Sequence, residues 1–249
     1  MMFLNRLGRI ETTSCSLHLM AMVFMLCDHL WGTIVSGNDW LTCIGRISFP
    51  IFAFLIVEGY FHTKNFRKYL GRIFIFAVIS EIPFNLAIGS RIFYPIHQNV
   101  LWSFLISLGL IHWNERTKQS NRIWKRILVG CLSAVLGFML GILTMVDYYH
   151  AGILTVLAFY FFRGGKWWNY LGQLLCLVYI NREILGGLVY EFTVFGMDVS
   201  VHQQSFALLA LIPIWLYRGK KGYHSRALQL FHYAFYPLHL LFLGILKML

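Results

Sequence analysis

The sequence predicts an all-α fold, a polytopic bundle of about nine transmembrane helices in the cell membrane with a cytoplasmic N-terminus. Composition is the first observation behind this class: 58% of the 249 residues are hydrophobic, 12% are charged, and the mean hydropathy is +0.64. Recurring apolar stretches of about 20 residues are the second, because each can cross the hydrocarbon layer as a helix. No loop between them is long enough for a separate domain, so we expect residues 1–249 to form one integral membrane domain.

Nine apolar stretches define the expected helices. The first stretch is not closed by a small-residue cleavage site, so we expect a retained helix rather than a removed signal peptide. The seventh is the weakest because Asn181, Arg182 and Glu183 interrupt it, and residues 185–195 after it are compatible with a re-entrant or interfacial segment. The expected helices lie near residues 16–36, 42–62, 70–89, 97–113, 127–146, 148–163, 169–187, 203–218 and 231–248.

The basic residues set the expected orientation, because Lys and Arg accumulate in short cytoplasmic loops. With the N-terminus inside, where Arg6 and Arg9 lie, all but four of the 21 basic residues fall on the inner side. An odd number of spans then places the C-terminus outside. This asymmetry accounts for the net charge of +11, so we expect no nucleic-acid partner. A basic inner rim would also attract an anionic cytosolic ligand or the anionic lipids of the bilayer.

Asp28 and His29 stand side by side in an otherwise apolar stretch. An acidic side chain at the centre of a membrane helix costs roughly 2.5 to 3.5 kcal/mol on insertion scales, so this pair needs a partner. His29 lies roughly 20 Å along its helix, in the outer half of the bilayer. Gly32 and Ser36 continue its face as a strip of small residues that lets a neighbour or a substrate approach. We interpret the pair as functional, against the alternative of a contact that only fixes helix packing.

Other polar residues fall near the same depth. Arg46 lies near the outer rim of the second helix, where it can anchor at lipid headgroups, pair with Asp28 or stabilise a developing oxyanion. Residues 97–99 open the fourth helix, and residues 147–152 form the turn into the sixth. Together with Asp28 and His29, these segments predict one polar pocket in the outer half of the bundle. Glu58 and His62 are interpreted as a side-chain pair at the opposite interface.

The last helix carries His232, Tyr236 and His239 at positions i, i+4 and i+7, which form one stripe running from the inner surface toward the midplane. Two histidines without a carboxylate neighbour or an HExxH spacing do not indicate a metal site. The five cysteines stand singly without ligand spacing, so neither a disulfide framework nor a metal centre is expected.

Several short segments resemble the TraX family, and the resemblance covers nearly the whole chain. They are residues 25–29, 44–54, 98–100 and 235–239. The resemblance implies an integral membrane acetyltransferase that takes acetyl from cytosolic acetyl-CoA; the founding member is associated with acetylating the N-terminus of conjugative pilin. The family pattern carries over to Asp28, His29, Gly45, Arg46, Phe49, Pro50, Asn99, Tyr236 and His239. The chain departs from it at Phe84-Asn85, where Phe-Asp is expected, and at Asp147-Tyr148-Tyr149, where Asp-Tyr-Gly is expected.

With this activity, His29 is expected to act as the general base on the acceptor, with its tautomer fixed by a carboxylate such as Asp28 or Asp147. If the carboxylate comes from another helix, Asp28 pairs with Arg46. Arg46 and Asn99 are interchangeable candidates for stabilising the oxyanion. An acetyl-histidine intermediate stays open, with His239 as the alternative acetyl carrier nearer the donor.

The expected partners are acetyl-CoA, as acetyl donor, and an acceptor that approaches from outside or within the membrane. The acceptor is a peptide N-terminus or another amine or hydroxyl. The chain has no Gly-rich phosphate loop, so coenzyme A is expected to be held by basic side chains and helix ends. The candidates for this binding are Lys64, Arg67, Arg126 and Arg226, with Tyr236 added from the family pattern.

Two functions of other classes compete with this interpretation. A proton-coupled transporter or permease would use Asp28, Glu81 and His239 as a proton relay. Inverted repeats or paired broken helices would favour it, and the sequence displays neither. A structural subunit of a secretion or conjugation apparatus would tolerate His29→Ala with little loss beyond assembly.

Overall fold

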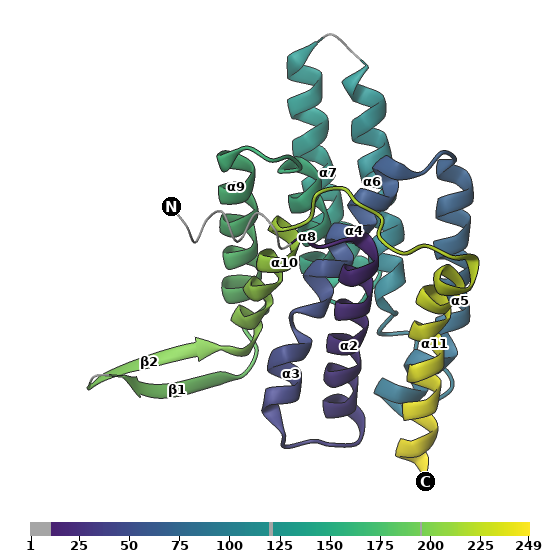
Figure 1. The fold of residues 1–249 in the computed structure, drawn as a ribbon, viewed down its shortest axis with the longest axis vertical. Coiled ribbons are helices and arrows are strands. Elements are labelled where there is room, and N and C mark those ends of the chain that lie inside the picture. The colour runs from purple at the N-terminus through teal and green to yellow at the C-terminus, as the bar shows by residue number, and fades with distance from the viewer. Residues whose placement is uncertain (1–10, 120–121, 195) are drawn as a thin grey trace.

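The computed structural model describes residues 11–119, 122–194 and 196–249, and most of this part of the chain is helical. The helices run roughly side by side, and a β-hairpin projects from one flank (Figure 1). Arg6 and Arg9, which contributed to the predicted orientation, lie outside the described residues.

The first half of the chain forms six of the described helices, and side-chain caps mark several of their starts. Thr13 and Ser16 form a capping box at the first helix, and Asn65 and Asn99 each accept a backbone N–H at the start of theirs. The helices are α2 (Ser14–Thr33), α3 (Asp39–Gly45), α4 (Ser48–His62), α5 (Phe66–Gly89), α6 (Val100–Lys118) and α7 (Ile123–Leu143).

The expected helix at residues 42–62 is divided into α3 and α4, and the short break between them falls at Arg46 and Ile47. Pro50 lies in the first turn of α4, where a backbone N–H has no helical partner to lose. The break, rather than a proline kink in mid-helix, therefore sets the position of Arg46.

The second half of the chain contains several short elements followed by one long helix. They are α8 (Tyr149–Phe161), α9 (Trp167–Val178), a π-helix (Tyr179–Leu185), β1 (Val189–Val194), β2 (Met197–His202), a 3-10 helix (Gln203–Ala210), α10 (Leu211–Trp215) and α11 (Arg226–Met248). The π-helix continues α9 past Asn181, so the polar run that weakened the seventh predicted helix distorts the helix without ending it.

The β-hairpin corrects the expectation of a helical, re-entrant or interfacial segment at residues 185–195. β1 and β2 pair antiparallel, with Val189 opposite His202 and Val194 opposite Met197. Residues 189–194 are rich in β-branched and aromatic side chains, which favour extended backbone. Gly196, at φ +77°, supplies the left-handed residue that a tight hairpin turn requires. These local preferences outweigh the general hydrophobicity on which the helical expectation was based.

Five helices among the described residues are long and apolar enough to cross a membrane. They are α2, α3 together with α4, α5, α7 and α11. α8 is apolar but has 13 residues, roughly 20 Å of helix, which is shorter than a bilayer core. The expectations of about nine spans and of a cytoplasmic N-terminus are therefore not confirmed, whereas the helical membrane class is supported.

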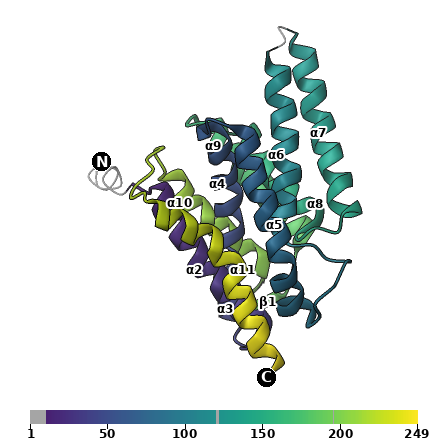
Figure 2. The ribbon, with the colours of Figure 1, turned by 90° about the vertical axis from the view of Figure 1, so that its right-hand side faces the viewer.

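The hydrophobic core surrounds α4 and α8, whose side chains Ile51, Val57, Ile153, Leu157 and Phe159 are almost completely buried. α11 packs against both α5 and α2, and α2 and α11 lie side by side in Figure 2. The connections α4–α5, α6–α7 and α8–α9 lie at one end of the bundle (Figure 1). Together with the α10–α11 connection and the helical turns that adjoin them, they hold most of the described basic residues. We call this the basic end.

Candidate functional site

Two cavities enter the bundle and share part of their lining. The large cavity, about 510 Å³, lies among α2, α4, α5 and α11 and reaches the basic end at Lys64 and Lys221. The small cavity, about 300 Å³, lies nearer the opposite end, beside the start of α8. Five side chains line both cavities and form what we call the shared wall: Met25, Phe52, Val100, Phe104 and Tyr236. A molecule in either cavity would therefore contact the same five side chains.

His29 lines the small cavity, and His239 of α11 lies behind it. His239 Nδ1 is 2.6 Å from the Phe235 carbonyl oxygen, so this nitrogen carries hydrogen and His239 Nε2 is the acceptor of a neutral ring. His29 Nδ1, 2.6 Å from that Nε2, is then the donor. The chain of bonds leaves the lone pair on His29 Nε2. The residue that orients His29 is thus a neutral imidazole, in place of the carboxylate expected from the sequence.

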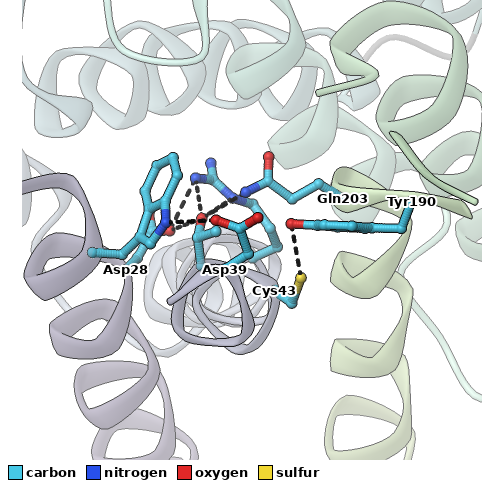
Figure 3. A network of polar contacts seen from close by, with 8 residues as sticks. Asp28, Asp39, Cys43, Tyr190 and Gln203 are labelled. Atoms are coloured by element: carbon cyan, nitrogen blue, oxygen red, sulfur yellow. Dashed lines mark hydrogen bonds and ion pairs between the residues drawn. The ribbon is translucent and has the colours of Figure 1, made fainter. Parts of the chain in front are cut away.

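Asp28 and Arg46 form the expected ion pair, with Arg46 Nη2 2.9 Å from Asp28 Oδ1. Thr42 ties the pair together: its hydroxyl donates to Asp28 Oδ1 at 2.7 Å and accepts from Arg46 Nη2 at 2.7 Å. Gln203 Nε2 donates to the same hydroxyl at 2.9 Å, so the chain segment after the hairpin joins the network (Figure 3). These bonds do not use Arg46 Nη1.

Close packing of α3 on α2 makes this ion pair possible. A Cβ added to Gly45 would lie 2.4 Å from Asp28 Cβ, a separation that two carbon atoms cannot adopt. Glycine at this position therefore allows Asp28 to approach the start of α4. Cys43 and Tyr190 connect the same helix to the hairpin through a 3.6 Å Sγ to hydroxyl contact (Figure 3).

Two loops close the small cavity at its outer edge. Gln98 pairs with the α7–α8 turn through backbone bonds of 2.9 Å to Met145 and 2.8 Å from Asp147. His97 Nε2 then lies 3.4 Å from Asp147 Oδ1, and this side-chain hydrogen bond raises the pKa of His97 above its usual 6.5. The loops bring together the two polar segments that the sequence placed in one outer pocket.

The α7–α8 turn has an uncommon backbone. Tyr148 and Tyr149 have φ values of 60° and 45°, a left-handed backbone conformation that residues other than Gly, Asn and Asp rarely adopt. Tyr149 occupies the position where the family resemblance led us to expect Gly, a residue that adopts this backbone without strain. Tyr148 stacks on Phe49, with ring centroids 4.2 Å apart, and both rings line the small cavity.

Asn99 is not brought into the site. It is fully buried and caps α6, and its side-chain amide donates to the Ala77 carbonyl at 2.8 Å and to Glu81. It lines neither of the two cavities. Glu81 is likewise bonded to Trp102 Nε1, at 2.7 Å. Asn99 therefore holds α6 to α5, and Arg46 is the oxyanion candidate that faces a cavity.

The predicted coenzyme A residues separate into two groups. Lys64 and Tyr236 line the large cavity, at its basic mouth and in the shared wall. Arg67, Arg126 and Arg226 are not among its lining residues; Arg126 donates instead to the Lys118 carbonyl at the tip of the α6–α7 hairpin. The lining adds cations that the sequence analysis did not select, Arg72 and Lys221.

A second histidine pair, which was not predicted from the sequence, lines the large cavity. His18 of α2 and His232 of α11 stack with ring centroids 4.7 Å apart and an interplanar angle of 1°. The signal was present in the sequence, because His18 precedes His29 by 11 residues and His232 precedes His239 by seven. Both spacings are close to whole numbers of helical turns, so each helix carries its two histidines on one face.

The fold and the two cavities define a helical membrane protein with a polar site enclosed between its helices. A family model described as TraX protein matches residues 14–247, and the chain belongs to this family. It is 29% identical over 254 residues to a protein of Dichelobacter nodosus described as probable fimbrial assembly protein FimC, serogroup H1, covering 96% of this chain and 97% of that protein. No solved structure matches the chain.

Proposed function

We propose that this protein is an integral membrane acetyltransferase. It moves an acetyl group from cytosolic acetyl-CoA, bound in the large cavity, to an amine or hydroxyl of an acceptor in the small cavity. The basic end faces the cytoplasm of the cell, and the chain crosses the cell membrane several times. The observation that carries the proposal is the shared wall, because it allows donor and acceptor to meet while each enters from its own side.

His29 is the general base. Its Nε2 lone pair, left free by the bond between Nδ1 and His239, is available to take the proton of an acceptor in the small cavity. A base must keep one tautomer to act repeatedly, and the Phe235 carbonyl supplies that constraint through His239. His239 is thus a positioning residue in this mechanism, and the alternative of an acetyl carrier is not needed.

Arg46 stabilises the oxyanion that forms on the acetyl carbonyl. Asp28 and Thr42 hold its Nη2, and the guanidinium, which also interacts with the Tyr148 side chain, lines the small cavity where the reacting group would bind. A fixed donor of this kind in a water-poor site typically contributes about 3 kcal/mol to lowering the barrier. Tyr236 lies in the shared wall, with its ring centroid 6.4 Å from that of His29, and contacts the acetyl group from the side.

The large cavity fits the donor in shape and charge. Acetyl-coenzyme A would supply an activated thioester at the end of a long arm and anionic phosphates at the other end. Lys64, Arg72 and Lys221 line the cavity on the basic side and attract phosphates, whereas the deeper lining is apolar and suits the arm. The His232 Nε2 atom is buried in this cavity and makes no hydrogen bond to the described residues, so a polar group of a ligand could bond to it.

The acceptor is a peptide N-terminus. Asp147 lines the small cavity and favours the approach of an ammonium group, from which a base can then remove protons. The fimbrial assembly description of the Dichelobacter relative and the association of the family with pilin acetylation point to a pilin-like subunit as the source of that N-terminus.

Acetyl transfer from radiolabelled acetyl-CoA to a peptide tests the proposal. The purified protein is expected to label a peptide that has the N-terminal sequence of a pilin subunit and to release free coenzyme A. His29→Ala is expected to abolish both signals, because the base is lost. His112→Gln is the matched control: His112 bonds to the Tyr60 hydroxyl at 3.1 Å and lines neither cavity, so transfer is expected to persist.

Two results would contradict the proposal. Folded protein that neither binds coenzyme A nor hydrolyses acetyl-CoA would favour the proton-coupled transporter instead. Equal transfer by wild type and His29→Ala would place the chemistry elsewhere in the chain.

A further inference from the structure

The stacked pair His18–His232 has no role in the mechanism above. His18 Nδ1 lies 2.7 Å from the Ser14 carbonyl oxygen, so it carries hydrogen and leaves Nε2 as the acceptor of the neutral ring. His232 Nε2 is buried without a partner among the described residues. Buried polar nitrogens are nearly always bonded, so an unpartnered one in a cavity is available to a water molecule or to a ligand. No group of three or more possible metal ligands occurs in the part of the chain that the structure describes, so a metal is not indicated.

The pair can hold at most one proton. Two positively charged rings at a centroid separation of 4.7 Å would repel each other strongly in an apolar cavity, whereas one charged and one neutral ring stack without that cost. The large cavity opens toward the basic end, from which a proton can be replaced. A site with these properties can deliver a proton and recover it.

Acetyl transfer from a thioester creates a need for that proton. When the acceptor nitrogen forms its bond to the acetyl carbon, the carbon–sulfur bond breaks and its electron pair stays on sulfur. A thiolate in an apolar cavity is poorly solvated and returns to the carbonyl unless it is protonated. Histidine is the side chain best suited to donate near neutral pH.

We propose that His232, supported by His18, protonates the departing thiolate of the donor. The inference rests on the proposed function. The acceptor proton goes to His29 Nε2 on the far side of the shared wall, and the proton for sulfur comes from His232 Nε2, which is recharged from the basic end. Both protons and the electron pair of the carbon–sulfur bond are then accounted for.

The positions of the residues along α11 fit this division. His232, Tyr236 and His239 follow one another at i, i+4 and i+7, so Tyr236 lies roughly 6 Å from His232 and about 4.5 Å from His239 along the helix axis. Tyr236 is in the shared wall, and the hydrogen-bonded rings of His29 and His239 are nearly coplanar, with centroids 4.9 Å apart. A thioester carbonyl beside Tyr236 would therefore lie about one turn from the proton donor and from the base.

The leaving-group pKa provides the test. His232→Phe keeps an aromatic ring for stacking and removes both nitrogens. With acetyl-CoA, its turnover is expected to fall about 100-fold below wild type, because general acid assistance is lost. With the S-acetyl ester of 4-nitrothiophenol, whose thiolate leaves without a proton, wild type and His232→Phe are expected to agree within about twofold. His112→Gln is expected to keep the wild-type ratio for both donors.

Ligand binding supplies a readout that does not depend on turnover. Neutral His232 can accept the S–H hydrogen of coenzyme A but not the methyl group of S-methyl-coenzyme A, so wild type is expected to bind coenzyme A about fivefold more tightly. His232→Phe and His232→Gln are expected to lose this preference, and size-exclusion profiles establish that each variant is folded.

The inference is overturned if His232→Phe loses the same factor with both donors, since that is the behaviour of a structural residue, or if it loses nothing with acetyl-CoA. An active wild type that keeps equal affinity for the two coenzyme A analogues would also overturn it. Failure of wild type to transfer acetyl from either donor would instead remove the proposed function, and the inference with it.

Discussion

The tautomer of His29 is set by a backbone carbonyl that reaches it through two successive hydrogen bonds. The Phe235 oxygen orients His239, and His239 in turn orients His29. His239→Phe keeps the ring and its packing but removes the acceptor for His29 Nδ1–H. We expect kcat to fall about 10- to 100-fold with little change in KM for the acceptor, because His29 samples the wrong tautomer. Steady-state kinetics with varied acceptor concentrations measure both constants.

Leu238→Ala is the control for this substitution, since Leu238 is adjacent on α11 and largely exposed on the outside of the bundle. It is expected to retain wild-type kcat. Full activity of folded His239→Phe would mean that His29 acts without an orienting partner.

Gly45 determines whether Asp28 can reach Arg46. In Gly45→Ala the new methyl group would stand 2.4 Å from Asp28 Cβ, so α2 and α3 must separate. The ion pair and the Thr42 bonds then lengthen, and we expect both a lower thermal midpoint and at least a 10-fold lower kcat, as oxyanion stabilisation weakens. Gly32→Ala is the matched control, because a Cβ at Gly32 meets no atom within 4 Å. Equal losses in both variants would show that glycine flexibility, rather than space, matters at these positions.

At the scale of elements, the α5–α6 and α7–α8 loops hold a titratable contact. The pKa of His97 is raised by its bond to Asp147, so the protonated form is favoured in the folded protein. The stability from this contact is fully present below the ordinary His97 value of 6.5 and is lost as the pH rises through the raised value. We therefore expect the thermal midpoint in detergent to fall between about pH 6 and about pH 8.5 more in wild type than in Asp147→Asn. Parallel pH profiles of the two proteins would contradict this assignment.

The polar pocket could be predicted from the sequence because charged and imidazole side chains within apolar stretches have to find partners inside the bundle. This argument correctly placed Asp28, His29 and Arg46 with residues of the 97–99 and 147–152 segments. It failed for Asn99, since an amide at a helix start serves equally well as a cap. It also missed Thr42 and Gln203, which are small or neutral residues that join the network only after the fold brings α3 beside the segment following the hairpin.

The pairing of His29 with His239 could not be predicted from helix periodicity. The stripe of His232, Tyr236 and His239 defines a face of α11, but periodicity within one helix does not say which other helix that face contacts. The packing of α11 on both α2 and α5 is a tertiary property. Once that packing is known, the spacing places the two histidines of each helix on the face toward the other helix, with those of α11 on either side of Tyr236.

At the scale of the whole molecule, the proposed reaction would use the shared wall to separate its protons as well as its substrates. Coenzyme A would leave toward the basic end as a thiol and take up one proton there. The acceptor, an ammonium group at neutral pH, would release its protons on the opposite side. If acetylation used an acceptor on the donor's own side, the same reaction would acidify that side. The sign of the pH change beside the donor therefore reports the sidedness of the site.

Proteoliposomes can measure that sign. Acetyl-CoA and a pH-sensitive dye are enclosed inside, an acceptor peptide is added outside, and K⁺ with valinomycin removes any membrane potential. Only molecules with the basic end facing inward meet the enclosed donor, so the internal pH is expected to rise as acetyl peptide appears outside. His29→Ala vesicles are expected to produce neither change. A fall in internal pH with acetyl peptide found only inside would mean that both substrates enter from the basic end, and the two-sided use of the cavities would then be wrong.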